Sequence, residues 1–384
     1  AAGENPAEQE VTVAITSTID KLDPLFMSTT QMGVVFSNMG ATFYGTDAYG
    51  KLVPDLGESV EKSEDGLTYT FKIKDGLVWS DGVPLTAEHF VYGIKRAIGY
   101  GPDNAYSKRN LTNFIKGAQE AANAQLDVAD MDSVGVVALD DTTFQITLST
   151  PCPFFERVLT EKTTAPVRPD FAPEHESTWS VNSGYPSCGP MVLESVVPES
   201  EAVLVKNEKY WNADAVKLDK ATFVVMPDSN AQLNAFRTGD IDIALNVPTE
   251  AAGNTEFAEC FAKPQKYVSS YFLLINSGPK NTVPALKDSN VRKALAMSID
   301  KETMLRILGG NDYNTQLDGF IPYGFEDVDG SDFRDAVSYY QYDPEGAKEL
   351  MEAAGFNENN RLSFEYFYSE GGSHEDIAVL LKEM

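Results

Sequence analysis

Residues that could perform chemistry are present, but their spacing forms no catalytic or metal-binding motif. The three histidines, His89, His175 and His374, are far apart, and the three cysteines include no Cys-x-x-Cys pair. The sequence has no Gly-x-Ser-x-Gly elbow, no His-Glu-x-x-His and no phosphate-binding Gly-rich loop. Asp327–Asp332 faintly resembles a calcium loop, but an acidic turn fits it better because the EF-hand spacing is missing. We therefore expect no catalytic residue, metal site or cofactor.

The charge balance excludes several kinds of partner. The chain has 58 acidic and 30 basic residues in 384, a formal net charge of −28. Such a surface repels phosphate backbones and anionic lipids, which argues against nucleic-acid binding and electrostatic membrane binding. No apolar run approaches the roughly 20 residues of a membrane-spanning helix. The polar segment Ala1–Glu10 has no signal-peptide pattern and is typical of a flexible tether.

Strands and helices alternate along the chain and would have to position any binding residues. β-Branched and aromatic runs predict strands at 11–15, 66–74, 143–148, 191–197, 202–205, 221–226, 241–245, 271–275 and 362–368. Apolar stripes behind capping residues predict helices at 86–99, 228–237, from 289, at 343–355 and from 374. We expect Trp79 in the core, and a lobe junction near the start of the proline-rich stretch Thr163–Pro190. The pattern indicates an α/β protein of at least two lobes.

Several motifs, weak alone, occur in a characteristic order. They are Leu22-Asp-Pro24, Leu52–Leu56 through Asp65–Phe71 to Trp79-Ser-Asp-Gly82, Leu85–Phe90, Ser187-Cys-Gly-Pro190 with Tyr210-Trp211, Asn234–Asp242, Val291–Asp300, and Asp343–Lys348 with Glu352–Phe356. In this order and spacing the chain resembles the solute-binding proteins of peptide-type ABC importers, the oligopeptide- and dipeptide-binding solute-binding family 5. Most of these motifs are structural, so they indicate fold and transport role more firmly than ligand.

The resemblance implies a fold and a domain organisation. It implies an α/β, two-lobed periplasmic-binding-protein-like fold (type II) that closes about a hinge, with an extra subdomain in lobe one. Lobe I would comprise residues 1–40 and 166–268, the extra subdomain 41–165, and lobe II 269–384. The family chain normally returns to the first lobe through a C-terminal segment, so the resemblance implies that this chain is C-terminally truncated and its second lobe incomplete.

The resemblance also implies a function without catalysis. The chain would capture an extracytoplasmic solute, an oligopeptide in the first instance, and deliver it as a monomer to the permease subunits of an ABC importer. It would be a cell-surface lipoprotein or a periplasmic protein. Alternatives are a receptor for a nickel chelate, a sugar or a signalling peptide and, less in keeping with the motifs, an α/β hydrolytic enzyme.

Ligand contacts follow from the resemblance where the local alignment is unbroken. Backbone pairing to an extended peptide falls on the loop after Pro24, and aromatic, amide and pocket-lining contacts fall elsewhere. The expected contacts are Ser28, Thr29, Thr30, Tyr106, Asn246, Tyr267, Ser369 and His374. Each has an alternative: a surface loop for 28–30, a core or surface tyrosine for Tyr106, a turn residue for Asn246, a hinge packing residue for Tyr267, and an exposed histidine for His374.

Two further expectations come from the resemblance. Cys152 and Cys188 fall in segments that are close in the family fold, so a disulfide between them is a hypothesis for an extracytoplasmic protein. The family aspartate that pairs with the peptide α-amine would lie past Met384. We therefore expect weak or no ligand binding by this chain, and micromolar affinity in a calorimetric peptide titration would contradict that expectation.

Overall fold

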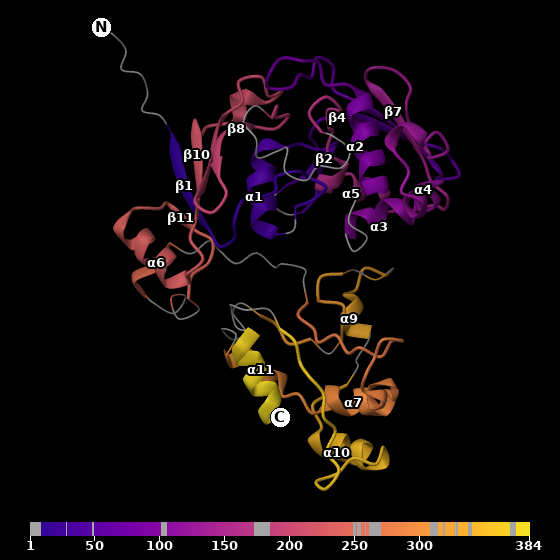
Figure 1. The fold of residues 1–384 in the computed structure, drawn as a ribbon, viewed down its shortest axis with the longest axis vertical. Coiled ribbons are helices and arrows are strands. Elements are labelled where there is room, and N and C mark those ends of the chain that lie inside the picture. The colour runs from indigo at the N-terminus through magenta and orange to yellow at the C-terminus, as the bar shows by residue number, and fades with distance from the viewer. Residues whose placement is uncertain are drawn as a thin grey trace. The chain divides into compact units, whose positions relative to one another are not determined.

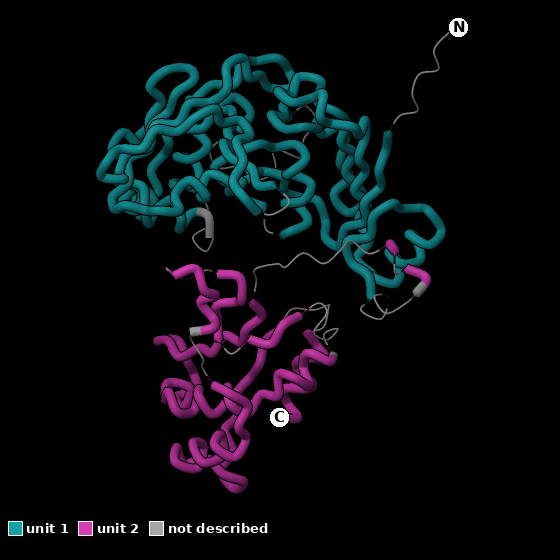
Figure 2. Tube along the Cα trace, turned by 180° about the vertical axis from the view of Figure 1, so that it is seen from behind, with its two compact units in different colours: residues 1–248 teal, residues 249–384 magenta. Residues whose placement is uncertain are grey.

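The computed structural model divides into two compact units, residues 1–248 and 249–384, each considered by itself (Figure 2). The structure describes residues 9–384 except for 28, 48–49, 101–105, 173–184, 249–250, 252–254, 258, 261–269, 308–313, 318, 326, 328, 337–339 and 369–373. In the part of the chain that it describes, no helix has both the length and the apolar character needed to cross a bilayer.

A five-stranded sheet with the order β11-β1-β10-β9-β8 organises the first unit (Figure 1). Its strands are β1 (Glu10–Ile15), β8 (Met191–Val197), β9 (Glu201–Lys206), β10 (Lys220–Val225) and β11 (Ile243–Ala244). β1 runs parallel to both β10 and β11, whereas β9 pairs antiparallel with β8 and β10. The five strands predicted from residues 11 to 245 that build this sheet are thus confirmed, and β10 and β11 run in the same direction because each is parallel to β1.

The second sheet of the first unit has the order β4-β5-β7-β6. Its strands are β4 (Gly57–Lys62), β5 (Thr68–Ile73), β6 (Val136–Ala138) and β7 (Thr143–Thr147), and the hairpin β2 (Tyr44–Thr46) and β3 (Leu52–Pro54) stands beside it. The alternation in β5 buries its odd positions, because one face of the sheet packs on α2 (Ala87–Tyr100). Phe90 of α2 stacks on Phe144 at 5.2 Å between ring centroids, and Trp79 is fully buried in the same core, as predicted.

The remaining helices of the first unit are shorter. They are α1 (Thr30–Met39), α3 (Tyr106–Thr112), α4 (Ala118–Ala124), α5 (Phe155–Val158) and α6 (Ser229–Thr238). The Asp228 side chain caps α6 by accepting from Ala231 N at 2.7 Å, and Gly239 ends the helix at φ +80°. A left-handed residue at this position favours glycine, so the predicted start and end of this helix are confirmed.

The second unit is built from helices. They are α7 (Ser289–Met297), α8 (Lys301–Ile307), α9 (Phe333–Ala336), α10 (Pro344–Ala353) and α11 (His374–Glu383), and α7 packs against α10. Asp343 caps α10 through Gly346 N at 2.9 Å, with Pro344 at the first turn. Asp329 Oδ1 accepts from both the backbone and the hydroxyl of Ser331, as expected of an acidic turn.

The strands predicted at 271–275 and 362–368 are wrong for this structure. Neither segment belongs to a sheet of the described residues, and Leu274 and Phe367 are 88% and 83% exposed. The physical reason is that an apolar run becomes a strand only when a partner supplies the ladder hydrogen bonds. No described strand pairs with either run.

The structure also corrects the expected disulfide. Cys152 and Cys188 are both free thiols, although both are buried in the core around the second sheet. Cys188 Sγ lies 3.9 Å from the carbonyl oxygen of Ala41, and burial raises the pKa of this thiol to about 12. Burial also raises the pKa of Cys152. Protonated thiols in apolar surroundings are unreactive, so both cysteines act as small buried apolar residues.

Candidate ligand-binding site

The carboxyl ends of three parallel strands meet at one edge of the five-stranded sheet. β1 lies between β10 and β11, and Ala14 pairs in register with both Val224 and Ala244. The residues that follow these strands therefore emerge at the same edge. In open α/β sheets such an edge is where ligands bind, because the loops there are free to vary above a fixed scaffold.

Thr29 is brought to this edge by hydrogen bonds to the segment that follows β1. Its hydroxyl lies 3.1 Å from Ser17 Oγ and accepts from Met32 N at 3.2 Å as the cap of α1. Gln31 Nε2 donates to Thr16 Oγ1 at 2.9 Å and ties the first turn of α1 to the same segment. Thr29 has extended backbone angles, φ −124° and ψ 153°, which suit pairing with an extended ligand.

Thr30 and Ser28 complete the predicted loop contacts. Thr30 is exposed and is the first residue of α1, so extended backbone ends at Thr29. Ser28 lies outside the described residues.

A buried ion pair fixes the chain just before this loop. Asp23 and Arg96 are 0% and 1% exposed, and their paired hydrogen bonds measure 2.9 and 2.6 Å. Asp23 Oδ1 also accepts from Leu25 N at 2.9 Å, and its backbone carbonyl accepts from Phe26 N at 3.0 Å. The turn is thereby locked to α2. One signal of this pair is present in the sequence and was missed. Arg96 is a cation among the apolar residues of the predicted helix 86–99.

Asn246 reaches the same edge from β11. It is exposed, and its backbone N–H donates to Gln232 Oε1 at 3.0 Å. Gln232 is fully buried, and its Nε2 donates to the carbonyl of Met226 at 2.6 Å. One amide side chain thus joins the segment after β10 to the segment after β11. Sequence reasoning missed Gln232, because nothing in the local pattern of α6 distinguishes it from its neighbours.

His374 lies in the second unit, where it contacts an aromatic side chain from a distant segment. Its Nδ1 is 2.8 Å from the hydroxyl of Tyr271, and the two rings stack at 5.7 Å between centroids and 27°. Burial, followed by a hydrogen bond with Tyr366, raises the pKa of the Tyr271 phenol. Tyr267 and Ser369 lie outside the described residues.

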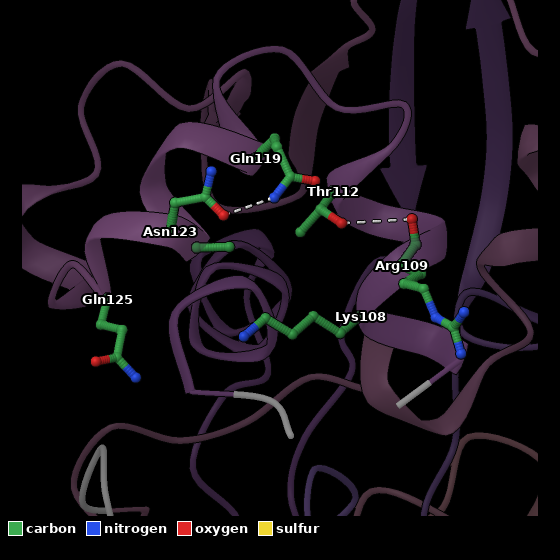
Figure 3. A pocket seen from close by; sticks show the side chains of 7 residues that line it. Lys108, Arg109, Thr112, Gln119, Asn123 and Gln125 are labelled. Carbon is green, nitrogen blue, oxygen red and sulfur yellow. Dashed lines mark hydrogen bonds between the residues drawn. The ribbon is translucent and has the colours of Figure 1, made fainter. Parts of the chain in front are cut away.

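Tyr106 opens helix α3, and its side chain lies outside the described residues. Three further residues of α3 line a cavity of about 470 Å³ together with residues of α4 and its C-terminal end (Figure 3). The lining is polar apart from one alanine and comprises Lys108, Arg109, Thr112, Gln119, Ala122, Asn123 and Gln125. Gln119 Nε2 donates to Asn123 Oδ1 at 2.9 Å across one wall. Among the described residues, no group of three or more histidines, cysteines or acids is placed to hold a metal ion.

A comparison with known protein families identifies the family of this chain. The family model described as bacterial extracellular solute-binding proteins, family 5 Middle, matches residues 51–384. The chain belongs to this family. Members of family 5 are extracellular or periplasmic solute-binding proteins rather than enzymes. The family expected from the ordered motifs is thereby confirmed.

Individual family 5 relatives cover nearly the whole chain. The oligopeptide-binding protein OppA of Bacillus subtilis is 30% identical over 349 residues, covering 88% of this chain and 61% of that protein. The periplasmic oligopeptide-binding protein OppA of Escherichia coli is 26% identical over 377 residues, covering 94% of this chain and 66% of that protein. The chain therefore spans less than two thirds of the length of either curated relative.

A solved structure of a family 5 protein supports the fold. The substrate-binding domain of an oligopeptide ABC transporter from Bacillus anthracis superposes with a TM-score of 0.79 at 25% identity, covering 98% of this chain and 72% of that chain. The predicted α/β fold of the periplasmic-binding-protein type is thereby confirmed.

Proposed function

We propose that this family 5 chain captures an extracytoplasmic oligopeptide and delivers it to the permease of an ABC importer. The main support for the proposal is the shared sheet edge: Thr29 is hydrogen-bonded to the segment after β1, and Asn246 follows the neighbouring parallel strand β11. The relatives named as oligopeptide-binding proteins support the choice of ligand.

Peptide capture at this edge would combine backbone and side-chain contacts. The extended backbone at Thr29 pairs with the peptide main chain, which gives affinity without requiring particular ligand side chains. Asn246 offers a side-chain amide from a loop that Gln232 fixes, so little conformational entropy is lost on binding. Ser28, Tyr106, Tyr267, Ser369 and His374 are proposed as the further contacts.

We also propose how the chain is divided into lobes and where and in what form it acts. The proposed domains are lobe I at residues 1–40 and 166–268, an extra subdomain at 41–165 and lobe II at 269–384. The chain acts as a monomer outside the cytoplasm, lipid-anchored or periplasmic, without cofactor or covalent chemistry. Ligand binding shifts a conformational equilibrium toward the form that docks on the permease, because only differential contacts can move such an equilibrium.

Equilibrium dialysis tests the choice of ligand. The chain is dialysed against a mixture of a random tripeptide library, maltose and a nickel–histidine complex, and retained solutes are quantified by mass spectrometry. Tripeptides are expected to be retained weakly, in line with the weak binding expected from the sequence, but to be enriched over the other two solutes. Preferential retention of maltose or of the nickel complex would overturn the proposal.

A pair of variants ties the binding to the sheet edge. Asn246→Ala is expected to lower tripeptide retention about five-fold, the effect of one hydrogen bond of about 1 kcal/mol. Asn234→Ala, an exposed position on α6, is the matched control and is expected to retain tripeptides like the parent chain. Equal retention by Asn246→Ala and the control would place the site elsewhere.

A further inference from the structure

The hydrogen bond between Tyr271 and His374 joins two segments of the second unit that are far apart in sequence. Tyr271 is 57% exposed and His374 is partly exposed at the first position of α11. The 2.8 Å contact engages Nδ1, so Nε2 is the ring nitrogen left for another partner. The stacked rings hold the imidazole plane nearly parallel to the phenol. The hydroxyl and the ring of Tyr271 therefore constrain His374 in two independent ways.

Neighbouring tyrosines extend this contact into an aromatic surface. Tyr366 is one of the groups that raise the pKa of Tyr271, and its ring stacks on that of Tyr368 at 5.8 Å between centroids and 27°. Tyr366 and Tyr368 are 37% and 46% exposed, and the stacking of their rings places them side by side. An exposed cluster of amphipathic rings is typical of a binding surface rather than of a core.

The direction of the hydrogen bond follows from the chemistry of the two groups. A phenol donates its single proton to a good acceptor, and the unprotonated imidazole nitrogen is such an acceptor. The raised pKa keeps the Tyr271 phenol protonated and able to donate. In a neutral histidine the hydrogen bond made by one ring nitrogen decides which nitrogen carries the proton.

We propose that Tyr271 is a positioning residue: its hydroxyl holds His374 in the tautomer with the proton on Nε2, which is then offered to an oxygen of the peptide ligand. This inference rests on the proposed peptide-binding function for the identity of the ligand. The recognised chemistry is an oxygen acceptor, either a main-chain carbonyl or a carboxylate. Tyr271 acts through His374.

The tautomer can be measured in the chain without any ligand. With ¹⁵N-histidine labelling only three imidazoles contribute signals, and long-range ¹H–¹⁵N correlation at alkaline pH distinguishes a protonated from an unprotonated ring nitrogen. His374 is expected to show unprotonated Nδ1 and protonated Nε2. In Tyr271→Phe, which keeps the stacked ring but lacks the hydroxyl, its nitrogen shifts are expected to move to the average of exchanging tautomers.

The control is Tyr342→Phe, which removes another exposed phenol of the second unit, 53% exposed, and is expected to leave His374 unchanged. Averaged shifts for His374 in the parent chain, or shifts unaltered in Tyr271→Phe, would overturn the proposal. Unchanged backbone amide signals of helices α7 and α10 show that the second unit of the variant is folded.

Addition of the random tripeptide library tests the ligand-facing side. The Nε2 signal of His374 is expected to move on binding, and Tyr271→Phe is expected to bind about three- to ten-fold more weakly. Peptide binding that perturbs backbone signals of the chain but leaves Nε2 unmoved would overturn the ligand-facing role. If the library perturbs no signal at all, the proposed function fails, while the tautomer measurement still decides the role of Tyr271 toward His374.

Discussion

Strand β5 of the first unit and the segment 362–368 of the second unit have similar sequence patterns and different outcomes. Both alternate aromatic or aliphatic side chains with polar ones, except that Phe367 occupies a polar position of the second segment. β5 pairs with β4 and β7 and buries Tyr69, Phe71 and Ile73 almost completely. Segment 362–368 belongs to no sheet of the described residues, and Phe364 and Phe367 are 47% and 83% exposed. Alternation therefore shows that a segment is compatible with a strand, and neighbouring strands decide whether it becomes one.

The largest effect expected from this contrast is on stability. Phe71→Ala should lower the free energy of unfolding of the first unit by about 3–5 kcal/mol, because a fully buried ring is replaced by a cavity. Phe367→Ala should cost less than about 0.5 kcal/mol. All three tryptophans precede residue 249, so tryptophan fluorescence in urea reports on the first unit, and circular dichroism reports on the whole chain. Equal losses in the two variants would refute the contrast.

The same contrast between buried and exposed groups applies to ion pairs. Asp23→Asn should destabilise the first unit by about 3 kcal/mol, because it leaves the buried guanidinium of Arg96 without its countercharge. Glu58→Gln breaks the pair between Glu58 and Lys72, whose side chains are 46% and 41% exposed, and should cost much less because solvent screens the pair. Urea unfolding of the two variants checks this. A loss for Asp23→Asn no larger than for Glu58→Gln would show that the buried pair does not anchor the turn.

The contrast between buried and exposed side chains can also be tested within one helix, α6. Gln232→Ala should speed hydrogen exchange of the Asn246 amide about five- to thirty-fold, since removing a bond of about 1–2 kcal/mol frees the loop after β11. Asn234→Ala alters an exposed position of the same helix and should leave that rate unchanged. Hydrogen exchange of the Asn246 amide is measured by NMR. Unchanged protection of this amide in Gln232→Ala would exclude the proposed role of Gln232 in fixing the loop.

The smallest effect concerns the two described histidines. His89 Nδ1 accepts from Trp79 Nε1 at 3.3 Å and from Thr86 N at 3.1 Å. Burial, with the nearby charge of Arg168, lowers the pKa of His89 below its ordinary value of 6.5. The unfolded chain therefore binds this proton first as the pH falls. Stability is fully present above about pH 6.5, and it declines below that value until the lower pKa of the folded state is reached.

Urea unfolding followed by tryptophan fluorescence between about pH 5 and 7.5 measures this decline. His89→Gln keeps an acceptor but does not titrate, and should flatten the curve. His374→Gln lies in the second unit and should leave the slope unchanged. If the parent and His89→Gln curves were parallel, His89 would not be the group responsible.

Local patterns predicted much of the fold of the first unit. β-Branched runs identified β1 and β8 to β11, and the Asp228 cap and Gly239 bounded α6. Both features depend on residues adjacent in sequence, so the sequence contains the information needed to predict them. The family followed from motif order in the same way.

Pairings between distant residues could not be predicted. The partners Asp23 and Arg96 are 73 residues apart, and Gln232 reaches Asn246 across a strand and a loop. The strands expected at 271–275 and 362–368 failed for the same reason, because a partner strand is a non-local condition. The Cys152–Cys188 hypothesis placed both thiols in one core correctly, but proximity in a fold does not specify that two sulfur atoms meet.

The position of β1 in its sheet has a consequence for the time course of folding. β1 is among the first described residues to leave the ribosome, yet its partner β10 begins 210 residues later. At about 5–20 residues per second, roughly 10–40 s pass before Lys220 is synthesised. Contacts between residues so far apart in sequence also form slowly, because a long loop must close before any strand pairing forms. The nascent chain thus lacks the pairing of β1 with β10 until Lys220 has been synthesised, a period in which a translocation apparatus or a chaperone can still bind it unfolded.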